Sequence, residues 1–182
     1  MLIEKYTSDW ITNFTDLKRS IESGLIGFKY QIEHVGSTSV PQLDSKPIVY
    51  IDIDIIYENE SDFKKIKSGL IKIGYYYKGN QGIENREVFK RDGTPTQGIL
   101  ETTPHHLYVC LLDSKALERH ILLRNFLRKN DWVRLEYQEM KYELAHKANQ
   151  NKKRYAQLKE SNINNFIDRI IEKEKTKAQH TI

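Results

Sequence analysis

The sequence predicts an α+β protein, in which a mixed β-sheet is flanked by helices and followed by a C-terminal helical bundle. Short runs with apolar residues at every second position, separated by turns, fill much of residues 1–112 and indicate strands. Beyond Ser114 the apolar residues recur at helical spacing. We therefore expect an α+β core over residues 1–112 and a helical part over residues 113–182 that packs on it, forming one compact unit.

The first elements are a helix and a strand. The helix begins after the capping residues Ser8 and Asp9 and ends at a glycine-rich turn. Its apolar face comprises Trp10, Phe14, Leu17 and Ile21. A strand is expected over residues 30–35, after which the chain turns at Gly36 and Ser37.

A second strand and a second helix follow this turn. Pro47 is tolerated at the start of a strand over residues 48–57, where a missing N–H does little harm. Ser61 can cap the next helix, which ends at Gly74. The residues of this helix that are expected to face the sheet are Phe63, Ile66, Leu70 and Ile73.

Three further strands are predicted before the helical part, over residues 75–78, 87–91 and 105–112. Glycine-rich loops separate them, and the second of these loops covers residues 93–98. The alternation in the last strand places His106, Tyr108 and Cys110 on one face and Leu107, Val109 and Leu111 on the other.

The helical part is expected to contain helices over residues 115–129, 132–146 and 163–171. Ser114 is the predicted cap of the first of them. The charged tail from Lys173 is expected to fray.

Composition limits the classes of protein to which the chain can belong. The single cysteine, Cys110, lies in an apolar strand segment, so an intrachain disulfide is excluded and a buried position is expected. No apolar run approaches the length of a transmembrane helix, and the N-terminus lacks the features of a signal peptide. We therefore expect a soluble, cytoplasmic protein with no membrane partner, whereas the sequence makes no prediction of its oligomeric state.

Charge is distributed unevenly along the chain. Residues 1–112 contain 13 Lys and Arg against 15 Asp and Glu, whereas residues 113–182 contain 16 against 10. A basic helical part facing acidic strand residues suits a polyphosphate ligand. The same excess is also typical of an ordinary Lys-rich surface, so nucleic acid is not the expected partner.

One strand and the turn before it carry the candidate chemistry. Asp52 and Asp54 are two residues apart, so their side chains share one strand face, where carboxylates can hold Mg²⁺ together with substrate phosphates. The preceding turn, Gly36, Ser37 and Thr38, offers backbone N–H groups and hydroxyls to those phosphates. The alternative is a solvated strand face beside an ordinary turn.

Several ordered motifs surround this pattern. They read E-H-V-G-S-T-S-V-P-x-L at residues 33–43, S-K-P-I at 45–48, R-E-V-F-K-R at 86–91, H-H-L-Y-V at 105–109, R-H-I-L-L-R-N-F-L-R at 119–128 and Y-x-x-L-K from Tyr155. Together they resemble the GrpB family, an uncharacterised group with a nucleotidyltransferase-like fold, over roughly residues 4–171. The resemblance implies a nucleotidyltransferase-like mixed sheet with Asp52 and Asp54 as catalytic, metal-binding carboxylates.

The chain departs from the family pattern at Tyr50, where the family usually has Asp. Tyr50 shares its strand face with Asp52 and Asp54, and a phenol is a poor Mg²⁺ ligand beside carboxylates. The resemblance also places His106 or Tyr108 where a nucleotidyltransferase has a third carboxylate. Ligand binding is therefore better supported than catalysis.

Cations expected around the cleft are Lys46, Arg86, Lys90, Arg91, Arg124 and Arg128. Arg124 is the most informative, because it interrupts an apolar helical stripe and an Arg fork suits phosphate. The alternative for Arg124 is an ion pair with Glu33, Asp52 or Asp54 that closes the fold.

These residues predict a pocket between Ser37, the Asp strand, His106 and Arg124 that binds a nucleotide or a similar phosphate with Mg²⁺. One hypothesis is Mg²⁺-dependent nucleotidyl transfer, in which Asp52 and Asp54 position the metal and Arg124 neutralises developing charge. In that hypothesis the Gly-Ser turn holds the leaving pyrophosphate. A rival hypothesis is a non-catalytic module that binds a ligand or partner, and a third is an RNA-contacting protein that uses its basic helices.

Overall fold

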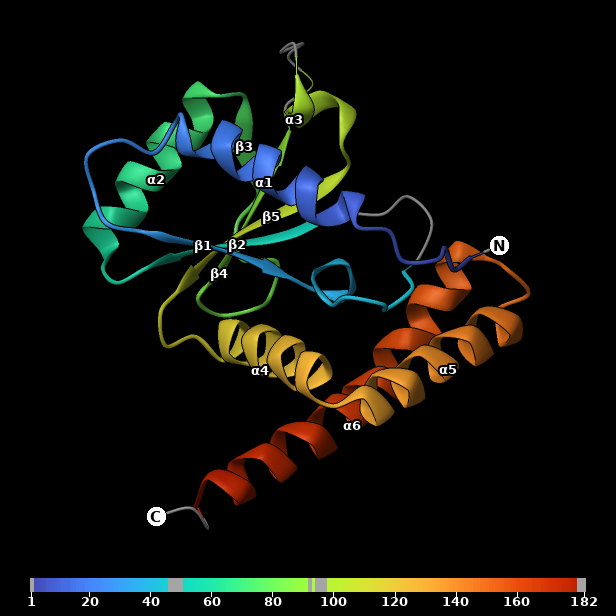
Figure 1. Ribbon diagram of the computed structural model, residues 1–182. Coiled ribbons are helices and arrows are strands. Elements are labelled where there is room, and N and C mark those ends of the chain that lie inside the picture. Colours follow the sequence, from blue (N-terminus) through green and yellow to red (C-terminus); the bar gives the residue numbers. More distant parts are fainter. Residues whose placement is uncertain (1, 46–50, 92, 94–97, 180–182) are drawn as a thin grey trace.

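The computed structural model describes residues 2–45, 51–91, 93 and 98–179 (Figure 1). Its strands are β1 (Gln31–Val35), β2 (Ile51–Tyr57), β3 (Tyr75–Tyr77), β4 (Arg86–Arg91) and β5 (His105–Leu111). Its helices are α1 (Asp9–Glu22), α2 (Glu60–Lys72), α3 (Ile99–Thr102), α4 (Lys115–Lys129), α5 (Asp131–Lys147) and α6 (Lys152–Gln179), with a short 3-10 helix, η1 (Ser37–Ser39). The α+β prediction is confirmed.

The strands form one mixed sheet in the order β1-β2-β5-β4-β3. The two central strands, β2 and β5, run parallel, whereas the remaining neighbours pair antiparallel. The β2–β5 register pairs Asp52 with His106 and Asp54 with Tyr108. Because residues paired in register share a face, these four side chains lie together on one face of the sheet.

The opposite face of the sheet is apolar, and α1 and α2 cover it (Figure 1). Ile51, Ile53 and Ile55 are completely buried there, and they pack with Leu107 and Val109 of β5. Each such side chain contributes about 1.5–3 kcal/mol on burial. The alternation that was predicted for the last strand is therefore confirmed, and the polar face is left for other contacts.

Helix α4 covers part of the polar face, and α5 and α6 extend beside it (Figure 1). A second apolar cluster joins these helices to the N-terminal part of the chain through Leu2, Ile3, Val40 and Leu43. Because Val40 and Leu43 directly follow η1, this cluster holds the turn after β1 against the helices. Within the described residues, no helix is both long and apolar enough to span a membrane.

The starts of α2 and α4 follow local capping chemistry, whereas Ser8, a predicted cap of α1, makes no side-chain capping hydrogen bond. Ser114 caps α4 as predicted, with its Oγ accepting a hydrogen bond from the N–H of Leu117 at 3.3 Å. Helix α2 is capped by Asn59 and not by Ser61, because Asn59 Oδ1 accepts from the N–H of Asp62 at 3.0 Å. The Ser61 hydroxyl instead donates to Asn59 Oδ1 at 2.7 Å.

Two helices differ from their predicted extents. Helix α6 begins at Lys152 and not near residue 163, because Tyr155 is buried in the helical cluster and extends the apolar stripe by two turns. The short helix α3 was not predicted, and it packs beside α1. The first residues of the predicted strand 48–57 lie outside the described part of the chain, as do residues 94–97 of the second loop.

Candidate functional site

The turn after β1 begins at a glycine with an unusual backbone conformation. Gly36 has φ 73° and ψ −174°, a region that only glycine enters without strain. A Cβ atom added to Gly36 would lie 2.2 Å from Asp52 Oδ2. Glycine is therefore required here because the backbone passes directly beside the Asp52 carboxylate, a reason that the sequence pattern does not reveal.

Asp52 lies at the edge of the polar face, between two strands. It is paired in register with Val35 of β1 and with His106 of β5. Its Oδ1 atom accepts a hydrogen bond from His106 Nδ1 at 2.8 Å, and its side chain is 31% exposed. This contact agrees with the predicted position of His106 beside the strand that carries Asp52.

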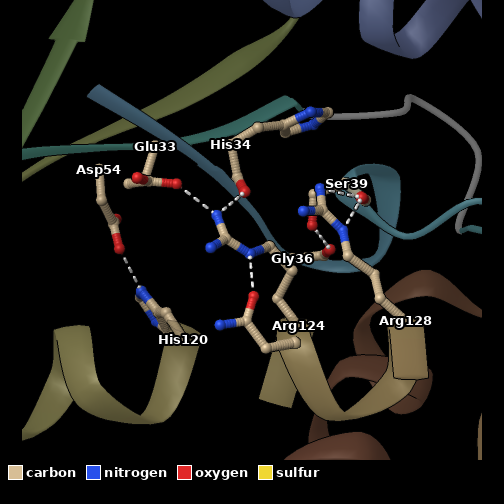
Figure 2. A network of polar contacts seen from close by, with 9 residues as sticks. Glu33, His34, Gly36, Ser39, Asp54, His120, Arg124 and Arg128 are labelled. Atoms are coloured by element: carbon tan, nitrogen blue, oxygen red, sulfur yellow. Dashed lines mark hydrogen bonds and ion pairs between the residues drawn. The ribbon is translucent and has the colours of Figure 1, made fainter. Parts of the chain in front are cut away.

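Asp54 has a different environment. Its side chain is completely buried, and Oδ2 accepts a hydrogen bond from His120 Nδ1 of α4 at 2.7 Å (Figure 2). Its other oxygen, Oδ1, is buried without a hydrogen-bond partner in the described structure. The period of two correctly places Asp52 and Asp54 on one face, but α4 covers only the second of them.

We expect the two carboxylates to differ in their effect on stability. Asp54→Asn removes a buried, charge-assisted hydrogen bond to His120 and should lower the free energy of unfolding by about 1–3 kcal/mol. Asp52→Asn, at a half-exposed position, should lower it by less than about 1 kcal/mol. Urea unfolding of both variants measures the difference, and equal losses would contradict the buried position of Asp54.

A cavity of about 330 Å³ lies between the turn at η1, the edge of β2 and helices α4, α5 and α6. Its volume is at the lower end of the range for small-molecule sites. The polar residues of its wall include Gly36, Ser37, Thr38, Ser45, Asp52, His120, Arg124, Lys141, Lys159 and Asn164. The structure therefore brings together the predicted Gly-Ser turn, Asp52 and Arg124, although these groups are far apart in the sequence.

Lys141 of α5 is a cavity residue that sequence analysis missed. It is only 2% exposed, and its Nζ donates to Ser37 Oγ at 3.2 Å and to the backbone carbonyl of Asp44. The available signal was its position four residues after Tyr137, within the buried stripe of α5. A lysine in such a stripe is as informative as Arg124 in α4.

Lys159 of α6 is a second cation that sequence analysis missed. Burial lowers the pKa of its ammonium group below the usual value, and the negative charge of Asp52 opposes this change. Lys159, Lys141 and Arg124 come from three different helices and line one cavity. The cavity wall thus gathers more positive than negative side chains.

Arg124 makes the ion pair that was considered as its alternative role. One guanidinium nitrogen, NH1, donates to Glu33 Oε2 at 2.5 Å and to the His34 carbonyl at 2.9 Å (Figure 2). Arg128 holds the turn itself, since its Nε and NH2 donate to the Ser39 carbonyl at 3.0 and 2.6 Å. Both arginines therefore fasten α4 to β1 and η1, and Arg124 also lines the cavity.

Some of the other residues predicted for the site do not line this cavity. Thr38 lines it, but its hydroxyl is hydrogen-bonded to His34 Nε2 at 2.9 Å. Lys90 of β4 is exposed and lines a separate hollow that includes His106, because β5 separates β4 from β2. Lys46, together with Tyr50, lies outside the described residues.

His34 lies between helix α1 and the turn that lines the cavity. Its ring stacks on Phe14 of α1 with centroids 4.5 Å apart, and burial lowers the pKa of His34 to about 4. The imidazole is therefore neutral at neutral pH. It acts as a packed, hydrogen-bonded link between α1 and Thr38 of the turn.

The sequence predicts two carboxylates at the site, whereas the cavity wall of the structure includes Asp52 but not Asp54. Within the described residues, no group of three or more His, Cys, Asp or Glu side chains is arranged to hold a metal ion. Asp54 is hydrogen-bonded to His120 and does not line the cavity, so Asp52 is the one of the two predicted carboxylates in the described cavity wall. Asp52 alone fits a Mg²⁺ ion that arrives with phosphate ligands.

Comparison with known proteins places the chain in a family. A family model described as GrpB protein matches residues 1–173. The chain belongs to the GrpB family. Glutamate-rich protein GrpB of Alkalihalophilus pseudofirmus is 28% identical over 173 residues, which cover 94% of each protein. UPF0157 protein YqkA of Bacillus subtilis is 30% identical over 142 residues, which cover 77% of this chain but only 38% of YqkA.

Solved structures support the same assignment of the fold. The crystal structure of the conserved protein GrpB from Enterococcus faecalis has a TM-score of 0.72 at 25% identity, covering 94% of this chain and 98% of that one. The Cid1 poly(U) polymerase has a TM-score of 0.51 at 12% identity, covering 71% of this chain and 41% of Cid1. The GrpB fold of this chain is thus nucleotidyltransferase-like, as the sequence motifs implied.

Proposed function

We propose that this GrpB-family chain binds a nucleotide or a similar phosphate-bearing small molecule in the cavity between η1 and helices α4–α6. The observation that carries the proposal is the set of three cations in the cavity wall, Arg124, Lys141 and Lys159, of which Lys141 is buried and donates to Ser37. Among the described residues Asp52 is the one carboxylate of that wall, so a negative charge from a ligand would stabilise these cations. A phosphate group beside Ser37 supplies that charge.

The remainder of the cavity suits the rest of such a ligand. Lys159 and Arg124 add positive charge to the wall, while Leu123, Tyr155 and Ile167 provide apolar and aromatic surface. This combination of a few convergent polar groups with apolar walls is typical of small-molecule sites. A phosphate would lie near the cations and an organic group near the apolar wall.

Magnesium enters the proposal only as a companion of the phosphate. Asp52 would provide one carboxylate oxygen, and the bound ion would reduce repulsion among the phosphate oxygens. The proposal therefore predicts that Mg²⁺ strengthens phosphate binding, whereas the ion alone binds weakly. Isothermal titration calorimetry with inorganic pyrophosphate, with and without Mg²⁺, measures both effects.

Lys141→Met tests the proposal directly. Methionine keeps the unbranched shape of the side chain but removes its charge, so affinity for inorganic pyrophosphate should fall between about tenfold and a hundredfold. The matched control is Lys147→Met, because Lys147 is an exposed lysine of the same helix that forms an ion pair with Glu143 and does not line the cavity. Equal affinities of Lys141→Met and the wild type would refute the phosphate site.

Nucleotidyl transfer is the second candidate function, suggested by the fold that the chain shares with Cid1, which is named a poly(U) polymerase. A single cavity carboxylate favours binding without turnover, because transfer by two metals needs carboxylates that clamp two ions. We therefore expect little pyrophosphate release from a panel of nucleotides with Mg²⁺ or Mn²⁺. Release that disappears in Asp52→Asn would favour the transferase instead.

RNA binding by the basic helices is a weaker alternative. It predicts an affinity for RNA that falls steeply with salt and does not depend on Lys141. Binding assays with a single-stranded oligonucleotide at several salt concentrations distinguish it from the cavity site.

A further inference from the structure

His120 stands where two hollows meet. The phosphate cavity and a neighbouring hollow of about 610 Å³ share His120, Leu123, Asn164 and Ile167 as wall residues. The second hollow lies between the loop before β4, the first turns of α4 and helix α6. The two hollows therefore border the same side chains, with His120 in the wall of each.

Asp54 sets the orientation of the His120 ring. An ionised carboxylate can only accept hydrogen bonds, so Nδ1 of His120 carries the proton and donates a hydrogen bond to Asp54 Oδ2 at 2.7 Å (Figure 2). In a neutral imidazole the other nitrogen, Nε2, is then a hydrogen-bond acceptor on the opposite edge of the ring. Among the described residues, Nε2 has no partner.

The second hollow is polar but not strongly cationic. Arg86, Lys115 and Arg119 line it, but so do Glu84 and Asp113, and Arg119 is paired with Asp168. A phosphate is therefore better accommodated in the first cavity, beside Lys141. What the second hollow offers is space and hydrogen-bonding groups.

We propose that His120 Nε2 accepts a hydrogen bond from a hydroxyl group of a phosphate ester that spans both hollows. The ligand class is thus a hydroxyl-bearing phosphate ester, such as a phosphorylated sugar or nucleoside, and not inorganic phosphate alone. This inference rests on the proposed phosphate site. Asp54 acts as a positioning residue, because it fixes the tautomer and the direction of His120 without touching the ligand.

His120→Asn tests the ligand contact. The Asn amide nitrogen occupies the place of Nδ1 and keeps a donor to Asp54, but nothing replaces Nε2. We expect affinity for ADP to fall about fivefold, while affinity for inorganic pyrophosphate stays unchanged. His146→Asn is the matched control, because His146 is an exposed histidine of α5.

The outcomes separate this inference from the proposed function. If the wild type binds pyrophosphate and ADP, and His120→Asn binds both as the wild type does, the His120 contact is refuted while the phosphate site stands. If the wild type binds neither compound, the phosphate site and this inference both fail.

A spectroscopic measurement tests the positioning role of Asp54. Long-range ¹H–¹⁵N spectra should show His120 as the Nδ1–H tautomer in the wild type and a mixture of tautomers in Asp54→Asn. Asp54→Asn should also weaken ADP binding about as much as His120→Asn, with pyrophosphate binding unchanged. A wild-type spectrum with the proton on Nε2, or with both nitrogens protonated, would overturn the assignment of Nε2 as an acceptor.

Discussion

Gly36→Ala is expected to lower the free energy of unfolding by about 3–4 kcal/mol. About 1–2 kcal/mol arises from placing an L-residue at φ 73° and ψ −174°. The remainder arises because the new Cβ would lie 2.2 Å from Asp52 Oδ2, so the carboxylate or the turn must move. Chemical denaturation of the variant and the wild type gives the difference.

Two comparisons separate these causes. Gly27 also has a positive φ, 86°, but a Cβ there would meet nothing within 4 Å, so Gly27→Ala should lose only about 1 kcal/mol. In an Asp52→Ala background, Gly36→Ala should lose about 1–2 kcal/mol, because the colliding carboxylate is gone. If the loss at Gly36 is the same with and without Asp52, the close contact between the turn and the carboxylate is wrong.

Acidification is expected to remove up to about 3 kcal/mol of stability through His34. The folded protein holds the pKa of this buried ring at about 4, whereas an unfolded histidine titrates near its usual value. Between these values the unfolded chain binds a proton that the folded chain does not, so stability falls as pH decreases from about 6.5 to 4. Of the charges around the ring, Arg124 and Arg128 lower its pKa, and Asp52 raises it.

The variant His34→Gln measures how much of the acid dependence of stability comes from His34. Urea unfolding at several pH values should give a shallower acid dependence for His34→Gln than for the wild type. Some dependence should remain, because burial also lowers the pKa of His105. Parallel pH profiles for the variant and the wild type would show that His34 is not protected from protonation in the folded protein.

The local parts of the fold were predictable from the sequence because they depend on neighbours along the chain. Alternation alone placed Leu107 and Val109 on the buried face and His106 on the polar face. The Ser114 cap was predictable for the same reason, as was the face of β2 that Asp52 and Asp54 share. The first turns of α6 were missed because few apolar residues, among them Tyr155 and Leu158, pack them against the helical cluster.

By itself, the sequence determined the sheet-and-helix plan, the family and the two strand positions that carry carboxylates. Only the tertiary structure decided what those carboxylates contact, because α4 lies over Asp54 and leaves Asp52 at the cavity. It also decided that Lys141 meets Ser37 across 104 positions of the chain. Such contacts depend on how helices pack on the sheet, and side-chain periodicity within one element reports only which face a residue occupies.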